Sequence, residues 1–157
     1  ALKDTIAAFG SVWTTDSAWA AMLAALSFTP LRERCWREGC TAIFAGTEHV
    51  QAFMLYREKV WGMYEHHTGL VSGILEEHLR QLRLNWLPDE EVRATGGHGC
   101  ICGELPEEAE GFRPTFLFGP ESSRFAGCGR MVSACGDPRF DRCSGLLWAA
   151  AGKEDLG

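Results

Sequence analysis

The chain has 157 residues, a formal net charge of −6 at neutral pH, and 46% hydrophobic residues. This length supports one domain with its own hydrophobic core and leaves too little chain for two such domains. Phosphate backbones repel an acidic chain, so the charge argues against a nucleic-acid partner. The sequence has no apolar run of 18 or more residues, so we expect no contact with a membrane either. The predicted protein is intracellular, in the cytoplasm or the nucleus.

Basic residues are unevenly divided, with twelve Arg against three Lys, and Asn occurs once. Enrichment in Ala, Gly and Arg with few Lys and Asn is typical of GC-rich coding DNA. An actinobacterium or a large DNA virus is a source of that kind. This composition carries no information about mechanism.

Residues 1–95 are predicted to be a helical half. Thr15, Asp16 or Ser17 is placed to cap a helix that continues to about residue 26, and this helix is Ala-rich and apolar on nearly every side. Pro30 suits the first turn of a new segment after Thr29, because its missing N–H has no intrahelical partner there. Residues 87–91 start another short helix, with acidic residues correctly placed in its first turn.

The clearest predicted element is a helix over residues 47–67, because its apolar residues recur at three- and four-residue spacing. A second helix is predicted over residues 70–84, and Thr68-Gly69 separates the two. A junction this short favours an antiparallel helical hairpin over residues 47–84. The side chains expected to be buried in that hairpin are Phe53, Val60, Tyr64, Val71, Ile74 and Leu75.

Residues 96–157 are predicted to form a Cys- and Gly-rich loop segment followed by a C-terminal helix. Four of the six prolines and five of the seven cysteines lie between residues 96 and 145. Residues 113–119 fit one short strand, which Pro114 confines to a sheet edge or to the start of the strand. Residues 144–151 fit a final apolar helix that docks back on the first half. The predicted fold is therefore mainly α, in a single domain over residues 1–157, with at most a small β element.

Cysteine and histidine residues suggest a segment that bound zinc holds in shape, because thiolate and imidazole are ligands that zinc prefers. No Cys-x2-Cys knuckle is present, so the spacing does not say which residues share an ion. One arrangement joins Cys35 and Cys40 to His98, Cys100 or Cys102, and a second draws on the last three cysteines. The alternative is buried free thiols. The expected zinc ligands are Cys35, Cys40, His98, Cys100, Cys102, Cys128, Cys135 and Cys143.

His67 and His78 lie on or beside the apolar faces of the two predicted helices, so the hairpin would let them face each other. A metal site or an acid–base pair can use such an arrangement. The favoured interpretation is simpler: each histidine sits at the margin of the core with one ring nitrogen hydrogen-bonded.

These features favour a zinc-binding regulatory or adaptor domain that acts through protein–protein interaction, with exposed aromatic residues as anchors for a protein partner. One alternative is a zinc- or thiol-dependent enzyme that uses Cys and His residues of the loop half, since Cys128 and Cys135 stand in Gly-flanked loops with Arg nearby. No Ser/His/Asp, phosphate-loop or dinucleotide motif accompanies them, so no catalytic residue is assigned. A second alternative is a secreted, disulfide-stapled protein, in which six of the seven cysteines pair.

Overall fold

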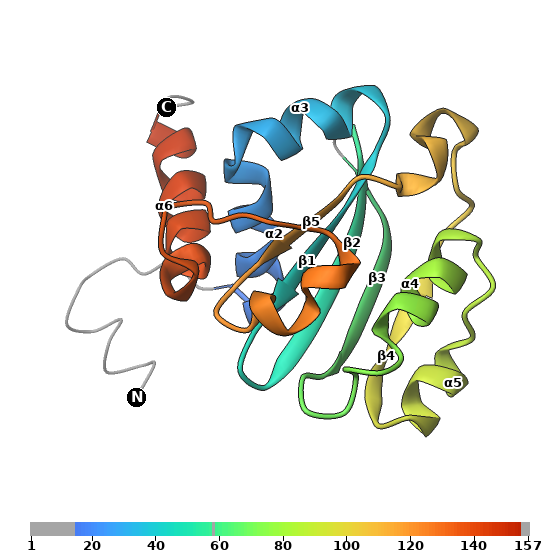
Figure 1. The fold of residues 1–157 in the computed structure, drawn as a ribbon. Coiled ribbons are helices and arrows are strands. Elements are labelled where there is room, and N and C mark those ends of the chain that lie inside the picture. The colour runs from blue at the N-terminus through green and yellow to red at the C-terminus, as the bar shows by residue number, and fades with distance from the viewer. Residues whose placement is uncertain (1–14, 58, 155–157) are drawn as a thin grey trace.

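A computed structural model describes residues 15–57 and 59–154, and a six-stranded mixed sheet lies at its centre (Figure 1). The strand order is β4-β3-β2-β1-β5-β6. In chain order the elements are α2 (Ser17–Ser27), α3 (Thr29–Arg37), β1 (Cys40–Ala45), β2 (His49–Tyr56), β3 (Lys59–His67), α4 (Leu75–Arg83), α5 (Asp89–Ala94), β4 (Gly97–Cys102), η1 (Glu107–Phe112), β5 (Thr115–Phe118), η2 (Ser122–Cys128), β6 (Arg130–Met131), η3 (Pro138–Phe140) and α6 (Asp141–Glu154).

The first three strands form an antiparallel meander, and β4 adds to its outer edge antiparallel to β3. The chain then returns to the other side of β1, where β5 pairs with β1 and β6 pairs with β5, both in parallel. It follows that β1, β3, β5 and β6 all end at the same end of the sheet, where β2 and β4 begin. We call this the carboxyl end of the sheet.

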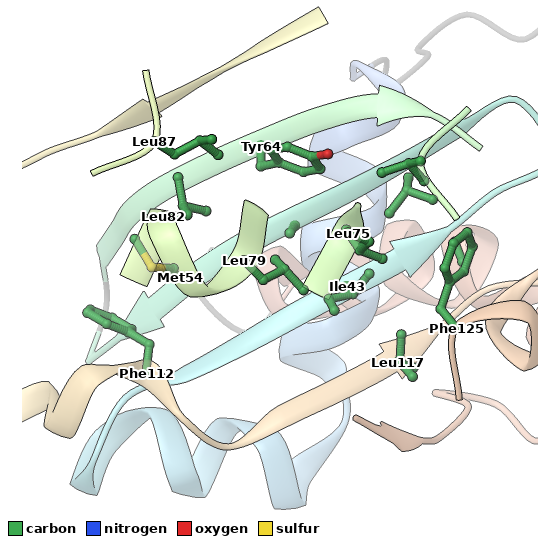
Figure 2. Close-up of a cluster of buried hydrophobic side chains, with 14 of the residues drawn as sticks. Ile43, Met54, Tyr64, Leu75, Leu79, Leu82, Leu87, Phe112, Leu117 and Phe125 are labelled. Atoms are coloured by element: carbon green, nitrogen blue, oxygen red, sulfur yellow. The ribbon is translucent and has the colours of Figure 1, made fainter. Parts of the chain in front are cut away.

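Helices cover both faces of the sheet (Figure 1). On one face, α4 packs Leu75, Leu79 and Leu82 against strand residues such as Ile43 and Met54 (Figure 2). On the other face, α2 and α3 cover a second apolar cluster, and α6 packs against α2. Gly145 of α6 lies so close to α2 that a Cβ there would overlap the α2 backbone at Ala20 and Ala24. The C-terminal helix therefore docks back on the first half, as the sequence predicted.

The prediction of a mainly α fold is wrong, because the chain has an α/β fold built on this sheet. The predicted helix over residues 47–67 is the β2–β3 hairpin. In β2 every residue after His49 is buried, since helices cover both faces of the sheet. A strand buried on both faces reads as a continuous apolar run without alternation, and such a run contains three- and four-residue spacings by chance.

Several local predictions are confirmed. The Asp16 carboxylate accepts a hydrogen bond from the Ala18 N–H at 2.7 Å and so caps α2, and Pro30 lies in the first turn of α3. The β5 strand begins directly after Pro114, although it lies inside the sheet between β1 and β6. The start of α4 differs from the prediction, because this helix begins at Leu75, five residues later than predicted.

Only some of the six side chains predicted to be buried in the hairpin are buried. Phe53, Tyr64, Val71 and Leu75 are buried, whereas Val60 is exposed and Ile74 is half-buried. Among the described helices, none has the length and apolar character that spanning a bilayer would require.

Candidate functional site

Three histidines meet at the carboxyl end of the sheet. His49 begins β2, His67 ends β3, and His98 is the second residue of β4. The β2–β3 register pairs His49 with His67, and the β3–β4 pairing brings His98 beside them. One ring nitrogen of each lies within 4.8 Å of one in each of the other two. The ring centroids are 4.7 to 4.9 Å apart.

A hydrogen-bonded turn fixes the backbone on both sides of His49 and His67. The Gly46 N–H donates to the His49 carbonyl at 2.9 Å, and the Thr68 N–H donates to the Glu48 carbonyl at 2.8 Å. The buried Thr68 hydroxyl donates to the Gly46 carbonyl at 2.7 Å. The β1–β2 turn and the end of β3 are therefore tied together, so the two imidazoles start from a fixed separation.

His98 is held between two glycines because α5 packs tightly on β4. A Cβ at Gly97 would press on His66 and Val92, and one at Gly99 would overlap the Asp89 carboxylate. Gly99 also has φ +131°, a conformation that residues with side chains rarely adopt. Asp89 in turn accepts a hydrogen bond from the Cys100 N–H at 2.9 Å. The start of β4 is thus anchored on α5.

A polar chain leads from the histidines into the protein. Glu65 Oε1 lies 3.9 Å from His49 Nδ1 and accepts a hydrogen bond from the Gln51 amide at 2.9 Å. The buried Gln51 carbonyl oxygen accepts from the Arg142 guanidinium at 3.1 Å. Arg142 belongs to α6 and lies 4.2 Å over the Phe44 ring, and burial lowers its pKa. The carboxylate beside the three imidazoles is therefore held by residues of the sheet and of α6.

The other two histidines lie on the opposite face of the sheet, in the core. The Tyr64 hydroxyl and His78 Nδ1 are 2.9 Å apart, and His78 Nε2 lies 3.9 Å from the Glu91 carboxylate. His66 Nε2 is 3.2 Å from the Thr95 hydroxyl. Burial lowers the pKa of both histidines and raises the pKa of Tyr64. His78 is thus a core histidine with a hydrogen-bonded nitrogen, as predicted, whereas His67 faces away from it.

All seven cysteines are free thiols, and four of them form two close pairs, one buried and one half-buried. Cys35 and Cys40 lie together under α3, where their mutual hydrogen bond and burial raise the pKa of Cys40. Cys100 and Cys102 lie on one side of β4, and their thiols donate to the carbonyls of Leu87 and Leu82. Burial raises the pKa of Cys100 to about 11, with Asp89 and Cys102 adding to the effect.

The last three cysteines lie apart from these pairs. Cys128 is half-buried against the α4 side of the core, and burial raises its pKa. Cys135 and Cys143 are exposed. Within residues 15–57 and 59–154, no cysteine joins a group of three ligand atoms that lie within 4.8 Å of one another. His98 is the one predicted ligand that belongs to such a group, so a zinc ion shared by the cysteines stays a prediction.

His49 was not among the predicted ligands, and His67 lies beside His49 and His98 instead of its predicted partner His78. Both omissions follow from treating residues 47–67 as a helix. In the hairpin a register shift between Met54 and Leu55 moves the pairing by one residue, and this shift sets His49 opposite His67 rather than opposite His66. A hairpin interpretation would have brought His49 near the end of β3, but only the bulge decides which histidine it faces.

Comparison with known proteins places the chain in an enzyme-related family. No curated protein matches its sequence. One family model matches residues 1–124, which is most of the 157-residue chain. That match corrects our expectation of a helical zinc-binding regulatory or adaptor domain, because the family is described by an enzyme activity. The chain belongs to the family described as "Putative pyruvate format-lyase activating enzyme (DUF1786)".

Proposed function

We propose that this chain is a catalytic domain of a metal-dependent enzyme, in which His49, His67 and His98 bind one divalent transition-metal ion. The observation that carries the proposal is the convergence of three imidazole nitrogens within 4.8 Å. Three protein nitrogens leave the fourth position of a tetrahedral ion open, which is the pattern of catalytic rather than structural zinc sites. Zinc is therefore the first metal to test.

The geometry needs only a small adjustment to hold such an ion. Zinc–nitrogen bonds of about 2.0–2.1 Å in a tetrahedral site place the ligand nitrogens roughly 3.3 Å apart. His67 and His98 are exposed, so their rings are free to rotate inward while the strands stay fixed. Glu65 faces Nδ1 of His49, and a carboxylate in that position orients a metal-ligating imidazole and raises its basicity.

The surroundings favour hydrolytic chemistry on a small substrate. A divalent ion with an open position supplies Lewis acidity and activation of water near neutral pH. A shallow hollow of about 200 Å³ adjoins the histidines and is lined by His98, Glu65, Met63 and Ile101 among others. The site lies at the carboxyl end of the sheet, on the antiparallel strands β2, β3 and β4. In this proposal Glu65 orients His49, and the apolar side chains of Met63 and Ile101 contact the substrate.

The family description raises a different chemistry, that of a radical activating enzyme. Radical chemistry is commonly carried by iron–sulfur clusters, which Cys thiolates hold. In the described part of the chain the two close cysteine pairs lie on opposite faces of the sheet, and no third ligand atom completes either pair. These cysteines therefore do not fit an iron–sulfur cluster.

Metal content of protein purified without a histidine tag tests the proposal. We expect one zinc ion per chain after loading and desalting, measured by elemental analysis. The variants His67→Ala and His98→Ala should lose the ion. Cys135→Ser and Cys143→Ser are matched controls, because these exposed thiols lie outside the cluster, and both should keep it. Loss of zinc in the cysteine variants with retention in the histidine variants would overturn the site.

Activity is tested separately from binding. Zinc-loaded protein should hydrolyse at least one of a panel of activated esters and phosphate esters, such as 4-nitrophenyl acetate and 4-nitrophenyl phosphate. Chelation and His67→Ala should both abolish that turnover. If the histidines bind zinc stoichiometrically and no metal-dependent turnover follows on any of these substrates, the metal site stands and the hydrolytic assignment is wrong.

A further inference from the structure

A groove of about 400 Å³ lies at the end of the sheet opposite the three histidines. It is bounded by α2, α3 and the C-terminal part of α6 on one side and by the β2–β3 turn on the other. Leu55 and Arg57 of the lining come six and eight residues after His49, a distance of roughly 20–25 Å at about 3.3 Å per residue. The groove is therefore a separate feature and not part of the proposed metal centre.

Three of the six tryptophans of the chain line this groove. Trp19, Trp36 and Trp148 come from α2, α3 and α6 and are 40–52% exposed. A large aromatic ring left half in water contributes less burial than the same ring in the core, and its free face can stack on another planar group. Three such rings from three different helices form an aromatic surface within one small cavity.

The charged residues of the groove are all cations. Arg32, Arg57 and Lys59 contribute to its lining, and no Asp or Glu is present among the described residues there. The whole chain carries a net charge of −6, whereas the described charged residues of this lining are three cations. The Arg32 guanidinium lies 5.7 Å from the centroid of Trp148, so cation and aromatic surface are adjacent. These three cations favour a ligand that carries negative charge.

We infer that the groove binds a small planar aromatic anion of the mononucleotide class. The planar ring stacks on the tryptophans, and the phosphate lies against Arg32, Arg57 and Lys59. The volume falls in the range of about 300–1,000 Å³ typical of small-molecule sites. Shape and charge together favour a small ligand.

Binding of three related probes tests this inference. Adenosine monophosphate carries both a ring and an anion, adenosine carries only the ring, and ribose 5-phosphate carries only the anion. Isothermal titration calorimetry and tryptophan fluorescence, both with a chelator present, keep the histidine site out of the measurement. We expect adenosine monophosphate to bind at least about tenfold more tightly than either fragment, because stacking and phosphate contacts each contribute.

Groove variants and matched controls locate the binding. Trp148→Leu should weaken adenosine monophosphate binding about five- to 150-fold, the range that loss of one stacking partner produces. Arg32→Gln should also weaken binding, and this loss should shrink as salt is raised, because screening reduces a charge contact. Trp86→Leu and Arg139→Gln are controls outside the groove, since Trp86 is 68% exposed elsewhere and Arg139 pairs with Asp137. Both controls should bind as the unmodified chain does.

Three results would overturn the inference. The first is no binding of adenosine monophosphate. The second is equal affinity for all three probes, and the third is unchanged affinity in both groove variants. Capture of an acidic, Trp-containing peptide without binding of the mononucleotide also overturns it and makes the groove a peptide site. Trp148, Trp86 and Arg139 are exposed and Arg32 is half-buried, so circular dichroism should show the same fold in every variant.

Discussion

His49 and His67 lie directly opposite each other on β2 and β3, with ring centroids 4.9 Å apart. Side chains at such a cross-strand pair are held at short separation by the backbone ladder itself. His98 reaches the same point from a third strand, 31 residues further along the chain. The position of these three rings therefore depends on strand pairing and on the groups that hold the strand ends.

Gly99→Ala should weaken metal binding without removing a ligand. The added Cβ would overlap the Asp89 carboxylate, and φ of +131° is unfavourable for alanine, so the start of β4 must shift and carry His98 with it. Titration with zinc should show a lower affinity. Gly103→Ala is the matched control, because its Cβ would meet nothing closer than 3.8 Å. Equal affinities in the two variants would mean that β4 does not position His98.

Thr68→Val should destabilise the fold by about 1–3 kcal/mol, because the Gly46 carbonyl loses its buried hydroxyl donor while side-chain volume is nearly kept. Urea unfolding measures the free-energy change. Thr29→Val serves as the control, since Thr29 is exposed, and it should change stability by less than about 0.5 kcal/mol. A similar small effect at both positions would show that the turn is not held by this hydrogen bond.

Leu79→Ala should cost about 2–5 kcal/mol of unfolding free energy, because this buried α4 side chain faces the sheet (Figure 2) and leaves a cavity when truncated. Leu84→Ala, at the exposed C-terminal end of the same helix, should cost less than about 1 kcal/mol. Chemical denaturation of both variants checks the pair. The reverse order of losses would place the other face of α4 against the sheet.

Acid should destabilise the fold as the pH falls below about 6.5. Burial lowers the pKa of His66 and His78 below their ordinary value of 6.5, so the unfolded chain binds protons that the folded chain does not. Their contribution is therefore complete above pH 6.5 and is lost as the pH falls toward the folded pKa. Glu91 and Glu77 oppose this effect at His78, but burial is the larger cause.

Urea unfolding at about pH 7.5 and about pH 5.5 measures that loss, at most about 1.4 kcal/mol per pH unit for each histidine. His78→Gln removes one of the two titrating groups and should reduce the slope of stability against pH. An unchanged slope would mean that His78 gains its proton equally well in the folded chain.

Thiol reactivity should divide the seven cysteines by burial. Cys135 and Cys143 are exposed and should react first with a thiol reagent such as dithionitrobenzoate. Cys35 and Cys40 are buried and should react only on unfolding, and the raised pKa of Cys100, about 11, should make it slow at neutral pH. All seven should titrate in denaturant without reductant. Fewer than seven would indicate disulfides and contradict the free-thiol arrangement.

Local chemistry made some elements predictable from the sequence. Asp16 caps α2, Pro30 opens α3, and Pro114 precedes β5, because each residue type favours one backbone environment whatever surrounds it. The strands β2 and β3 were not predictable in this way. The apolar residues of β2 are buried on both faces by helices from distant parts of the chain, so the run carries no alternation to mark it as a strand. β3 alternates in burial, but its buried positions hold Gly62, Tyr64 and His66, so the alternation does not show in its hydropathy.

The sequence by itself determined where several helices and β5 begin, and it supplied five histidines and seven free thiols. Only the tertiary structure decided which of them meet. His49, His67 and His98 are brought together by the register of three strands, while the cysteines are distributed over both faces of the sheet. Register depends on pairing between segments that lie apart in the chain. Residue spacing along the sequence therefore drew attention to the cysteines, whereas strand pairing brings the three histidines together.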